Sequence, residues 1–223
     1  MNVDVNKLQE MLRTQDGLNR IINVDWKTAK NPWTRAIWIE AAELLEHLGW
    51  KWWKKQEPNY GQAEIELVDI WHFILSQYAE GMNEVNIGQL TDAMIQRMHD
   101  RGRRIAVYQN QVVCIDDLQL RERVEVLAAA AAAGDDTLPA FTAICELIGL
   151  TFDQLYDFYI AKNVLNTFRQ RHGYKDGSYT KVWDGIEDNV VLEHLMQERP
   201  AADGNQLYQL LETIYEKVQK ESA

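Results

Sequence analysis

Two acidic motifs, Glu40-x-x-Glu43 and Glu66-x-x-Asp69, constrain this chain more than any other feature, because each lies within an apolar helical stretch. Residues three apart on a helix share a face, about 4.5 Å apart along the axis. Between 65 and 78, apolar side chains cover most of the helix circumference, which predicts a largely buried helix. A buried carboxylate is unfavourable unless it is paired or binds a metal. Two such helices packed together therefore predict a site for hard divalent cations with these four carboxylates as ligands.

Either motif alone is more typical of a solvated helix face, because glutamate is a good helix former. Their recurrence on two apolar helices, joined by a short connection rich in tryptophan and lysine, favours the metal site.

Composition limits the partners. A net charge of −11 argues against binding to nucleic acid or to an anionic membrane. No run of 18 apolar residues is present, so no segment is expected to cross a membrane, and the polar N-terminus does not read as a secretory signal. Cys114 and Cys145 show no metal-binding spacing and indicate a reducing compartment. We expect a cytoplasmic protein.

Helix signals are strong and strand signals weak, which predicts an all-α helical bundle. The chain divides into core helices with both acidic motifs (1–81), a variable and mobile helical insertion (82–136), and core and C-terminal helices with phosphate-binding motifs (137–223), all forming one functional unit. Asn31-Pro32 predicts a helix start with Asn31 as N-cap, and Thr151 with Gln154 predicts a capping box.

Two clusters in the first third suit a nucleobase. Gln15 and Asn19 are neighbours on one helix face, and each amide offers a donor and an acceptor for a base edge, although such pairs are commonly solvated. The segment from Trp50 to Lys54 alternates indole rings with lysines. The rings suit stacking on a base or walling a pocket, and the lysines suit phosphate. The alternative is a hydrophobic clamp between helices.

A third cluster suits phosphate. Lys162, Asn166 and Arg169 align on one face of the predicted helix 151–172, as expected for contacts with polyphosphate oxygens. The alternative is a solvated basic face. The segment 176–189 adds glycines, aromatic rings and Lys181, and we expect a loop there that closes over a ligand.

Taken in order, these blocks resemble the dimeric dUTPases of the all-α nucleoside triphosphate pyrophosphatase superfamily. The residues that carry the resemblance are Gln15-Asp16-Gly17-Leu18-Asn19, Glu40-Ala-Ala-Glu43, Trp50-Lys51-Trp52-Trp53-Lys54, Glu66-Leu-Val-Asp69-Ile-Trp-His72-Phe73, Lys162-Asn163 with Asn166 and Arg169, Gly173-Tyr174-Lys175, and Tyr179-x-Lys181-x-Trp183-x-Gly185-x-Glu187-Asp188-Asn189. The acidic blocks mark the superfamily, and the Trp-Lys block with the block from Lys162 to Lys175 points to the dUTPase branch.

The resemblance implies a homodimer that uses Mg²⁺, or Mn²⁺ as a substitute, to hydrolyse dUTP to dUMP and pyrophosphate, and also dUDP. It implies Glu40, Glu43, Glu66 and Asp69 as metal ligands, with Glu40, or else Glu43, acting on the attacking water. Gln15, Asn19 and the segment from Trp50 to Trp53 are expected to form the uracil pocket. The other expected substrate-binding residues are Lys54, Lys162, Asn166, Arg169, Tyr174, Lys175 and Lys181.

Three alternatives remain open at this point. A related pyrophosphatase acting on dCTP, or on both dCTP and dUTP, would carry the same carboxylates. A ferritin-like di-iron protein would use Asp69-x-x-His72 as a ligand pair, but it needs a second pair, and Glu43 with His47 has the wrong spacing. A non-catalytic helical interaction protein would leave the four carboxylates unexplained.

Overall fold

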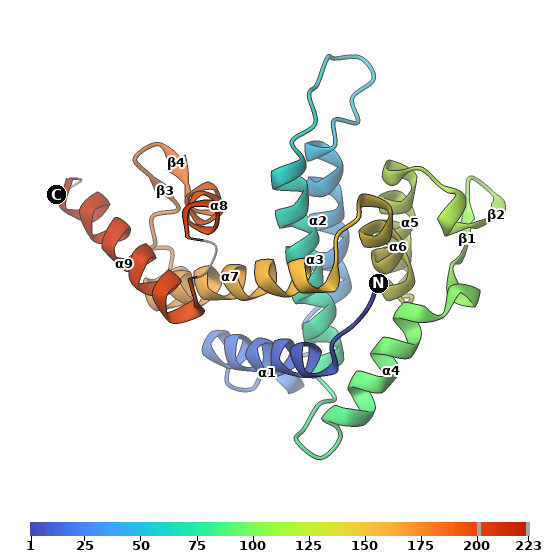
Figure 1. The fold of residues 1–223 in the computed structure, drawn as a ribbon, viewed down its shortest axis with the longest axis horizontal. Helices are drawn as coiled ribbons and strands as arrows, with labels where there is room; N and C mark the ends of the chain where they lie inside the picture. The colour runs from blue at the N-terminus through green and yellow to red at the C-terminus, as the bar shows by residue number, and fades with distance from the viewer. Residues whose placement is uncertain (200–201, 222–223) are drawn as a thin grey trace.

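The computed structural model describes residues 1–199 and 202–221, and α-helices dominate it (Figure 1). The helices are α1 (Val5–Ile22), α2 (Trp33–His47), α3 (Tyr60–Ala79), α4 (Ile87–His99), α5 (Leu120–Ala133), α6 (Leu138–Ile148), α7 (Phe152–Arg171), α8 (Asp188–Glu198) and α9 (Gly204–Glu221). Two small antiparallel hairpins are formed by β1 (Ile105–Tyr108) with β2 (Gln111–Cys114) and by β3 (Val182–Trp183) with β4 (Ile186–Glu187). The prediction of an all-α fold is confirmed.

The larger hydrophobic core is built around the hairpin of α2 and α3. These helices lie side by side over their length, α5 packs against α2, and α6 packs against α5 (Figure 1). Ile37 and Leu44 of α2 and Leu67 and Trp71 of α3 are fully or almost fully buried, and the Trp71 ring stacks on Phe141 with centroids 5.2 Å apart. The apolar stripes predicted for the two acidic helices are therefore the surfaces that hold them together.

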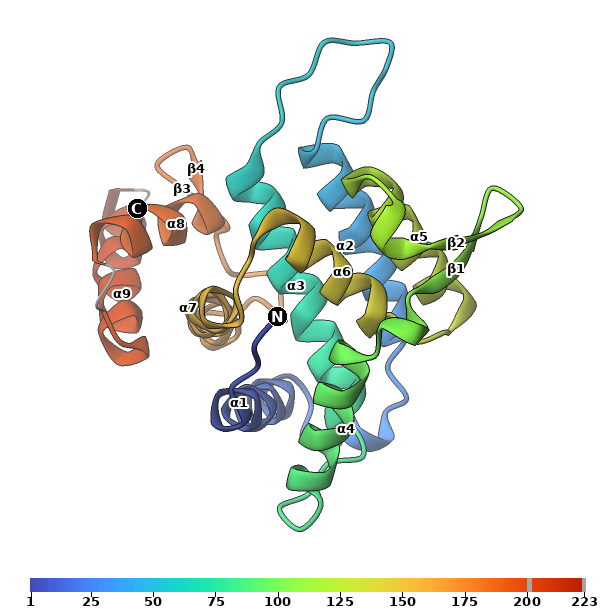
Figure 2. The same cartoon turned by 45° about the vertical axis from the view of Figure 1, so that its right-hand side comes forward.

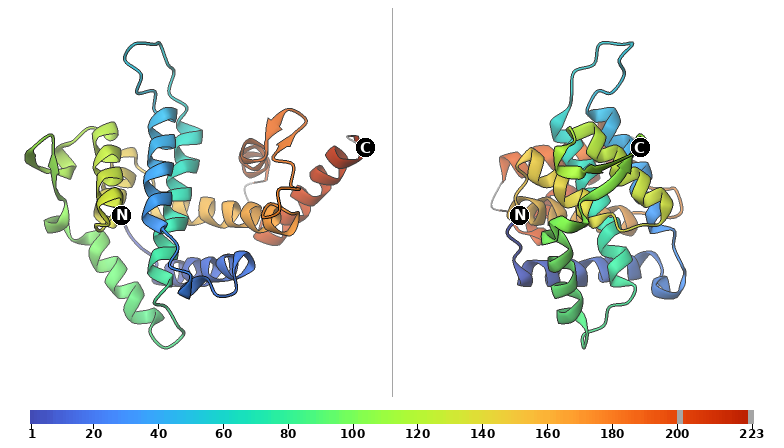
Figure 3. Two further views of the ribbon diagram at one scale, coloured as in Figure 1. Left: turned by 180° about the vertical axis from the view of Figure 1, so that it is seen from behind. Right: turned by 90° about the vertical axis from the view of Figure 1, so that its right-hand side faces the viewer.

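Helix α7 connects this core to a smaller one. Its first half contributes Phe152 and Leu155 to the larger core, and its second half contributes Leu165 and Phe168 to a core shared with α8 and α9. Figure 3 shows α7 as the bridge between the α2–α3 pair and the C-terminal helices. Residues near the middle of α7, such as Lys162, therefore lie at the junction of the two cores.

Helix α1 lies alongside α7 and also packs against α3, and Figure 2 views α1 and α7 nearly end-on. Leu8, Leu12 and Leu18 bury the face of α1 that meets these helices, whereas Ile21 and Ile22 at its end are exposed. Three helices thus meet at one place, and polar side chains there are removed from water.

The region 82–136 differs from a purely helical insertion. Its helices α4 and α5 flank the β1–β2 hairpin, and Val124 and Leu127 of α5 lie in the larger core. The hairpin turn places Gln109 and Asn110 at φ of 50° and 64°. No glycine occupies this turn, so the usual sequence signal for a two-residue hairpin is absent.

One further local prediction is wrong, and the segment expected to be a loop holds some regular structure. Helix α2 begins at Trp33, with Pro32 in the N-cap position and no side-chain cap, so Asn31 does not cap it. The segment 176–189 holds the β3–β4 hairpin, and α8 already begins at Asp188. The capping box of Thr151 is present as predicted.

Among the described helices, none is by itself long and apolar enough to cross a membrane, although the bent pair α6 and α7 meets that test by length and composition.

Candidate active site

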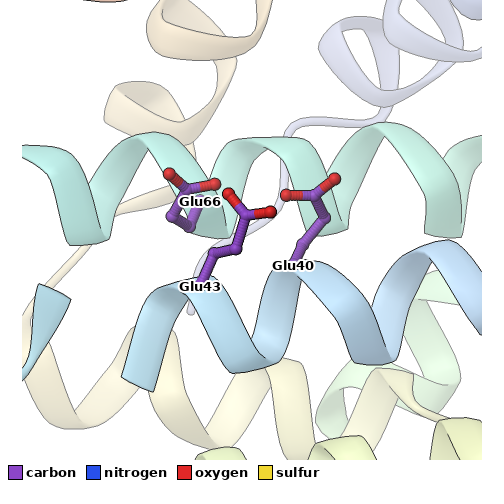
Figure 4. A group of neighbouring side chains, drawn as sticks. All are labelled: Glu40, Glu43 and Glu66. Atoms are coloured by element: carbon purple, nitrogen blue, oxygen red, sulfur yellow. The ribbon is translucent and has the colours of Figure 1, made fainter. Parts of the chain in front are cut away.

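Three carboxylates from two helices meet where α2 faces α3. Glu40 and Glu43 on α2 point toward Glu66 on α3 (Figure 4), and one carboxylate oxygen of each lies within 4.8 Å of the others. A spacing of three residues places both α2 carboxylates on the side that faces α3. Glu66 is buried, Glu40 is half-buried and Glu43 is exposed, so the group opens to solvent on the Glu43 side.

The electrostatics of this group favour a bound cation. Burial raises the pKa of Glu40, and the negative charges of Asp69, Glu66 and Glu43 raise it further. Burial and Asp69 likewise raise the pKa of Glu66, whereas Lys162 opposes that shift. Like charges crowded in a partly desolvated place are stabilised by a proton or a metal ion. A set of oxygen donors with this charge fits Mg²⁺ or Mn²⁺ rather than a softer metal.

Asp69, the fourth predicted ligand, lies one turn along α3 but does not belong to this close group. Its carboxylate forms an ion pair with Lys162 of α7, with 2.8 Å between Oδ2 and Nζ. On the opposite side, His47 Nε2 lies 3.4 Å from Glu66 Oε1. The carboxylates are thus flanked by a cationic group on one side and an imidazole on the other.

The predicted phosphate-binding face of α7 is held in a buried network. Lys162 Nζ and Arg169 Nη2 both donate to Asn189 Oδ1, at 2.8 and 3.0 Å. Arg169 also forms a bidentate pair with the fully buried Asp188, at 2.8 and 2.7 Å, and donates to Asn166 Oδ1 at 3.1 Å. Lys162 therefore faces the carboxylates, whereas the Arg169 guanidinium ties α7 to the start of α8.

The remaining predicted phosphate and sugar contacts lie at more exposed positions. The Tyr174 ring centre is 5.7 Å from the guanidinium carbon of Arg169. Lys175 donates to the backbone carbonyl at the end of α1, and Lys181 lies 3.5 Å from a carboxylate oxygen of Glu187.

Gln15 and Asn19 are buried in a polar network between α1, α3 and α7, not solvated. Gln15 Nε2 donates to Asn19 Oδ1, both amides donate to Ser76 Oγ, and His72 Nδ1 lies 2.7 Å from Gln15 Oε1. The Tyr159 hydroxyl lies 3.1 Å from the same Gln15 oxygen. The sequence patterns assign no site role to His72 or Ser76, although two polar residues four apart on an otherwise apolar helix are a signal for a buried polar contact.

The tryptophan-rich segment is not part of this network. Trp50, Trp52 and Trp53 are 44%, 89% and 56% exposed, in a loop that extends beyond the ends of α2 and α3 (Figure 1). The loop joins α3 at Tyr60, and Ser76 lies about 24 Å further along that helix. Within one chain the structure therefore does not bring the tryptophans, or the adjacent exposed Lys54, to the amides of the predicted uracil pocket.

Comparison with known proteins agrees with this geometry. A family model described as dUTPase matches residues 7–174, which include both acidic motifs, the buried amides and the polar face of α7. No curated protein matches the chain. Because the matched segment covers well over half of the sequence and contains the facing carboxylates, this chain belongs to the all-α dimeric dUTPase family, whose activity is that of a dUTP diphosphatase.

Proposed function

We propose that this protein hydrolyses dUTP to dUMP and pyrophosphate, and dUDP to dUMP and phosphate, with Mg²⁺ as cofactor and Mn²⁺ as a substitute. The observation that carries the proposal is the meeting of Glu40, Glu43 and Glu66 on two facing helices within the dUTPase match. Asp69 is the proposed fourth ligand, on the adjoining turn.

The carboxylates and the metal have separate tasks. Bound Mg²⁺ offsets the charge of the phosphates and lowers the pKa of water. Glu40 is our candidate for orienting the attacking water and accepting its proton, because its half-buried carboxylate lies close to those of Glu43 and Glu66 in the proposed metal site. Glu43, on the same face of α2, is the next candidate for this role.

The cationic and amide groups bind the rest of the nucleotide. Lys162 is the proposed principal phosphate contact, since its ammonium lies beside Asp69. The proposed further phosphate and sugar contacts are Asn166, Arg169, Tyr174, Lys175, Lys181 and Lys54. Asn19 is proposed to read the uracil edge, with Gln15 in support.

A substrate survey tests the proposal. With Mg²⁺ or Mn²⁺, we expect turnover of dUTP and dUDP, and rates for dTTP, dCTP and UTP that are lower by about a hundredfold or more. Cytosine would leave mismatched polar groups buried unpaired, whereas dTTP and UTP would have to be excluded by the 5-methyl group of thymine and by the ribose 2′-hydroxyl. Release of pyrophosphate or phosphate over this panel, with and without excess chelator, is the measurement. Undiminished turnover in chelator would contradict the metal assignment, and a preference for dCTP would contradict the assigned base.

We also propose a homodimer. Trp38 and Ile39 form an exposed apolar surface on α2, beside the helix face that carries the carboxylates, and Trp52 and Trp53 are exposed on the adjoining loop. Large apolar side chains exposed on neighbouring elements are typical of an interface. Light scattering at micromolar concentration is expected to give twice the mass of one chain. The mass of a single chain would count against the proposal.

We propose a cytoplasmic location, because the cysteines do not form a disulfide. Cys114 and Cys145 are both free thiols, and burial raises the pKa of the Cys145 thiol, which keeps it unreactive.

A further inference from the structure

Ser76 has an unusual position in the buried amide network. Its hydroxyl donates its one proton to the backbone carbonyl of His72, at 2.8 Å. The same oxygen accepts from Gln15 Nε2 and from Asn19 Nδ2, each at 3.0 Å. A hydroxyl offers one donor and two acceptor positions, so Ser76 faces the two amides as an acceptor only.

This arrangement fixes which way both amides point. Each must turn its NH₂ group toward Ser76, because a carbonyl oxygen placed there would meet lone pairs. The second N–H of Gln15 goes to Asn19 Oδ1 at 3.1 Å, which fixes the Asn19 carbonyl as well. Gln15 Oε1 in turn accepts from His72 Nδ1, so the proton of the neutral imidazole is on Nδ1.

The network leaves specific groups for a ligand. In the part of the chain that the structure describes, Asn19 keeps one N–H and one carbonyl lone pair beyond the hydrogen bonds given above. His72 Nε2 is buried without any hydrogen-bond partner in the same part of the chain. A buried acceptor without a partner is unfavourable, which indicates that the network is completed by something outside this chain.

The direction in which the Asn19 amide points its NH₂ group and its carbonyl oxygen distinguishes two pyrimidines. Uracil presents a carbonyl next to an N–H, so it pairs with an amide N–H beside an acceptor. Cytosine presents an amino group next to a ring nitrogen acceptor, and it needs the same amide turned over. A residue that prevents the Asn19 amide from rotating therefore favours uracil over cytosine. With cytosine in the pocket, donors of the amide would face donors of the base, and acceptors would face acceptors.

We propose that Ser76 is a positioning residue that sets the preference for uracil over cytosine by holding the amides of Asn19 and Gln15 in one sense. The inference rests on the proposed function, in which Asn19 reads the base. Ser76 is fully buried and acts through Asn19.

The test is the ratio of kcat/KM for dUTP to that for dCTP in Ser76→Ala. We expect this ratio to fall about tenfold, through a higher KM for dUTP and a lower one for dCTP. Both substrates are measured on one preparation, so the fraction of folded enzyme cancels from the ratio. Titration calorimetry with dUMP and dCMP compares the affinities for the two bases in the absence of catalysis.

Thr142→Val is the matched control. Thr142 is also fully buried on a helix, and its hydroxyl also donates to the carbonyl four residues earlier, at 2.8 Å, but it contacts no amide side chain in the described structure. This variant is expected to keep the wild-type ratio. If both variants lowered the ratio equally, the effect would come from general loosening of the core and the inference would be wrong.

A double-mutant comparison tests the route through Asn19. Asn19→Ala alone is expected to remove the uracil preference, and adding Ser76→Ala is expected to change the ratio no further. A wild-type ratio in Ser76→Ala, in an enzyme that does prefer dUTP, would overturn the inference. By contrast, wild-type protein that releases pyrophosphate from no nucleotide would refute the proposed function, while the dUMP and dCMP titrations would still decide the role of Ser76.

Discussion

Replacing Glu43 with glutamine is expected to lower the rate of pyrophosphate release from dUTP by at least about a hundredfold, and Asp69→Asn is expected to do the same. Glutamine keeps the shape of the side chain but removes the charge that binds a cation. Glu43 is the exposed member of the carboxylate group, so its replacement leaves no cavity in the core. The far-ultraviolet circular dichroism spectrum should therefore remain that of the wild type.

Glu64→Gln is the matched control for this prediction. Glu64 lies on α3, the helix that carries Asp69, and burial together with the nearby Glu193 raises its pKa, but it is outside the carboxylate group. We expect wild-type turnover and an unchanged Mg²⁺ dependence from this variant. Equal losses in Glu43→Gln and Glu64→Gln would show that charge alone, and not a metal site between α2 and α3, controls the activity.

Replacing Arg169 with alanine is expected to reduce the free energy of unfolding by about 3–5 kcal/mol, in addition to any loss of nucleotide binding. The substitution leaves the carboxylate of Asp188 fully buried without its bidentate partner. The Tyr179 hydroxyl, which donates to Asp188 at 2.8 Å, compensates for only part of that charge. The measurement is urea unfolding followed by circular dichroism.

Arg171→Ala, two residues further along α7, separates the buried pair from a general effect of charge. Its guanidinium carbon lies 5.3 Å from the Tyr208 ring centre on an exposed part of the helix, so a change below about 1 kcal/mol is expected. If Arg169→Ala cost no more than Arg171→Ala, the pair with Asp188 would not be the link between α7 and α8.

The sequence by itself determined the helical fold and the place of the carboxylates. Apolar periodicity is a local property, so the helices that carry both acidic motifs are found where their patterns predict them. The spacing of three residues then places Glu40 beside Glu43 on any helix, whatever packs against it. The capping box of Thr151 is equally local, since its partner Gln154 lies within the same turn. The β1–β2 hairpin was missed for the converse reason, because its turn residues carry no glycine signal.

Only the tertiary structure decided the partners of these residues. Lys162 and Arg169 looked alike as cations on one face of a helix, yet the first pairs with Asp69 and the second with Asp188. Likewise, no local pattern shows that the hydroxyl of Ser76 accepts from two amides more than 50 residues away. Such contacts depend on how α1, α3 and α7 cross, and that geometry is set by the packing of whole helices. The same packing leaves the tryptophan-rich loop at the far end of α3, although its composition suited a base pocket.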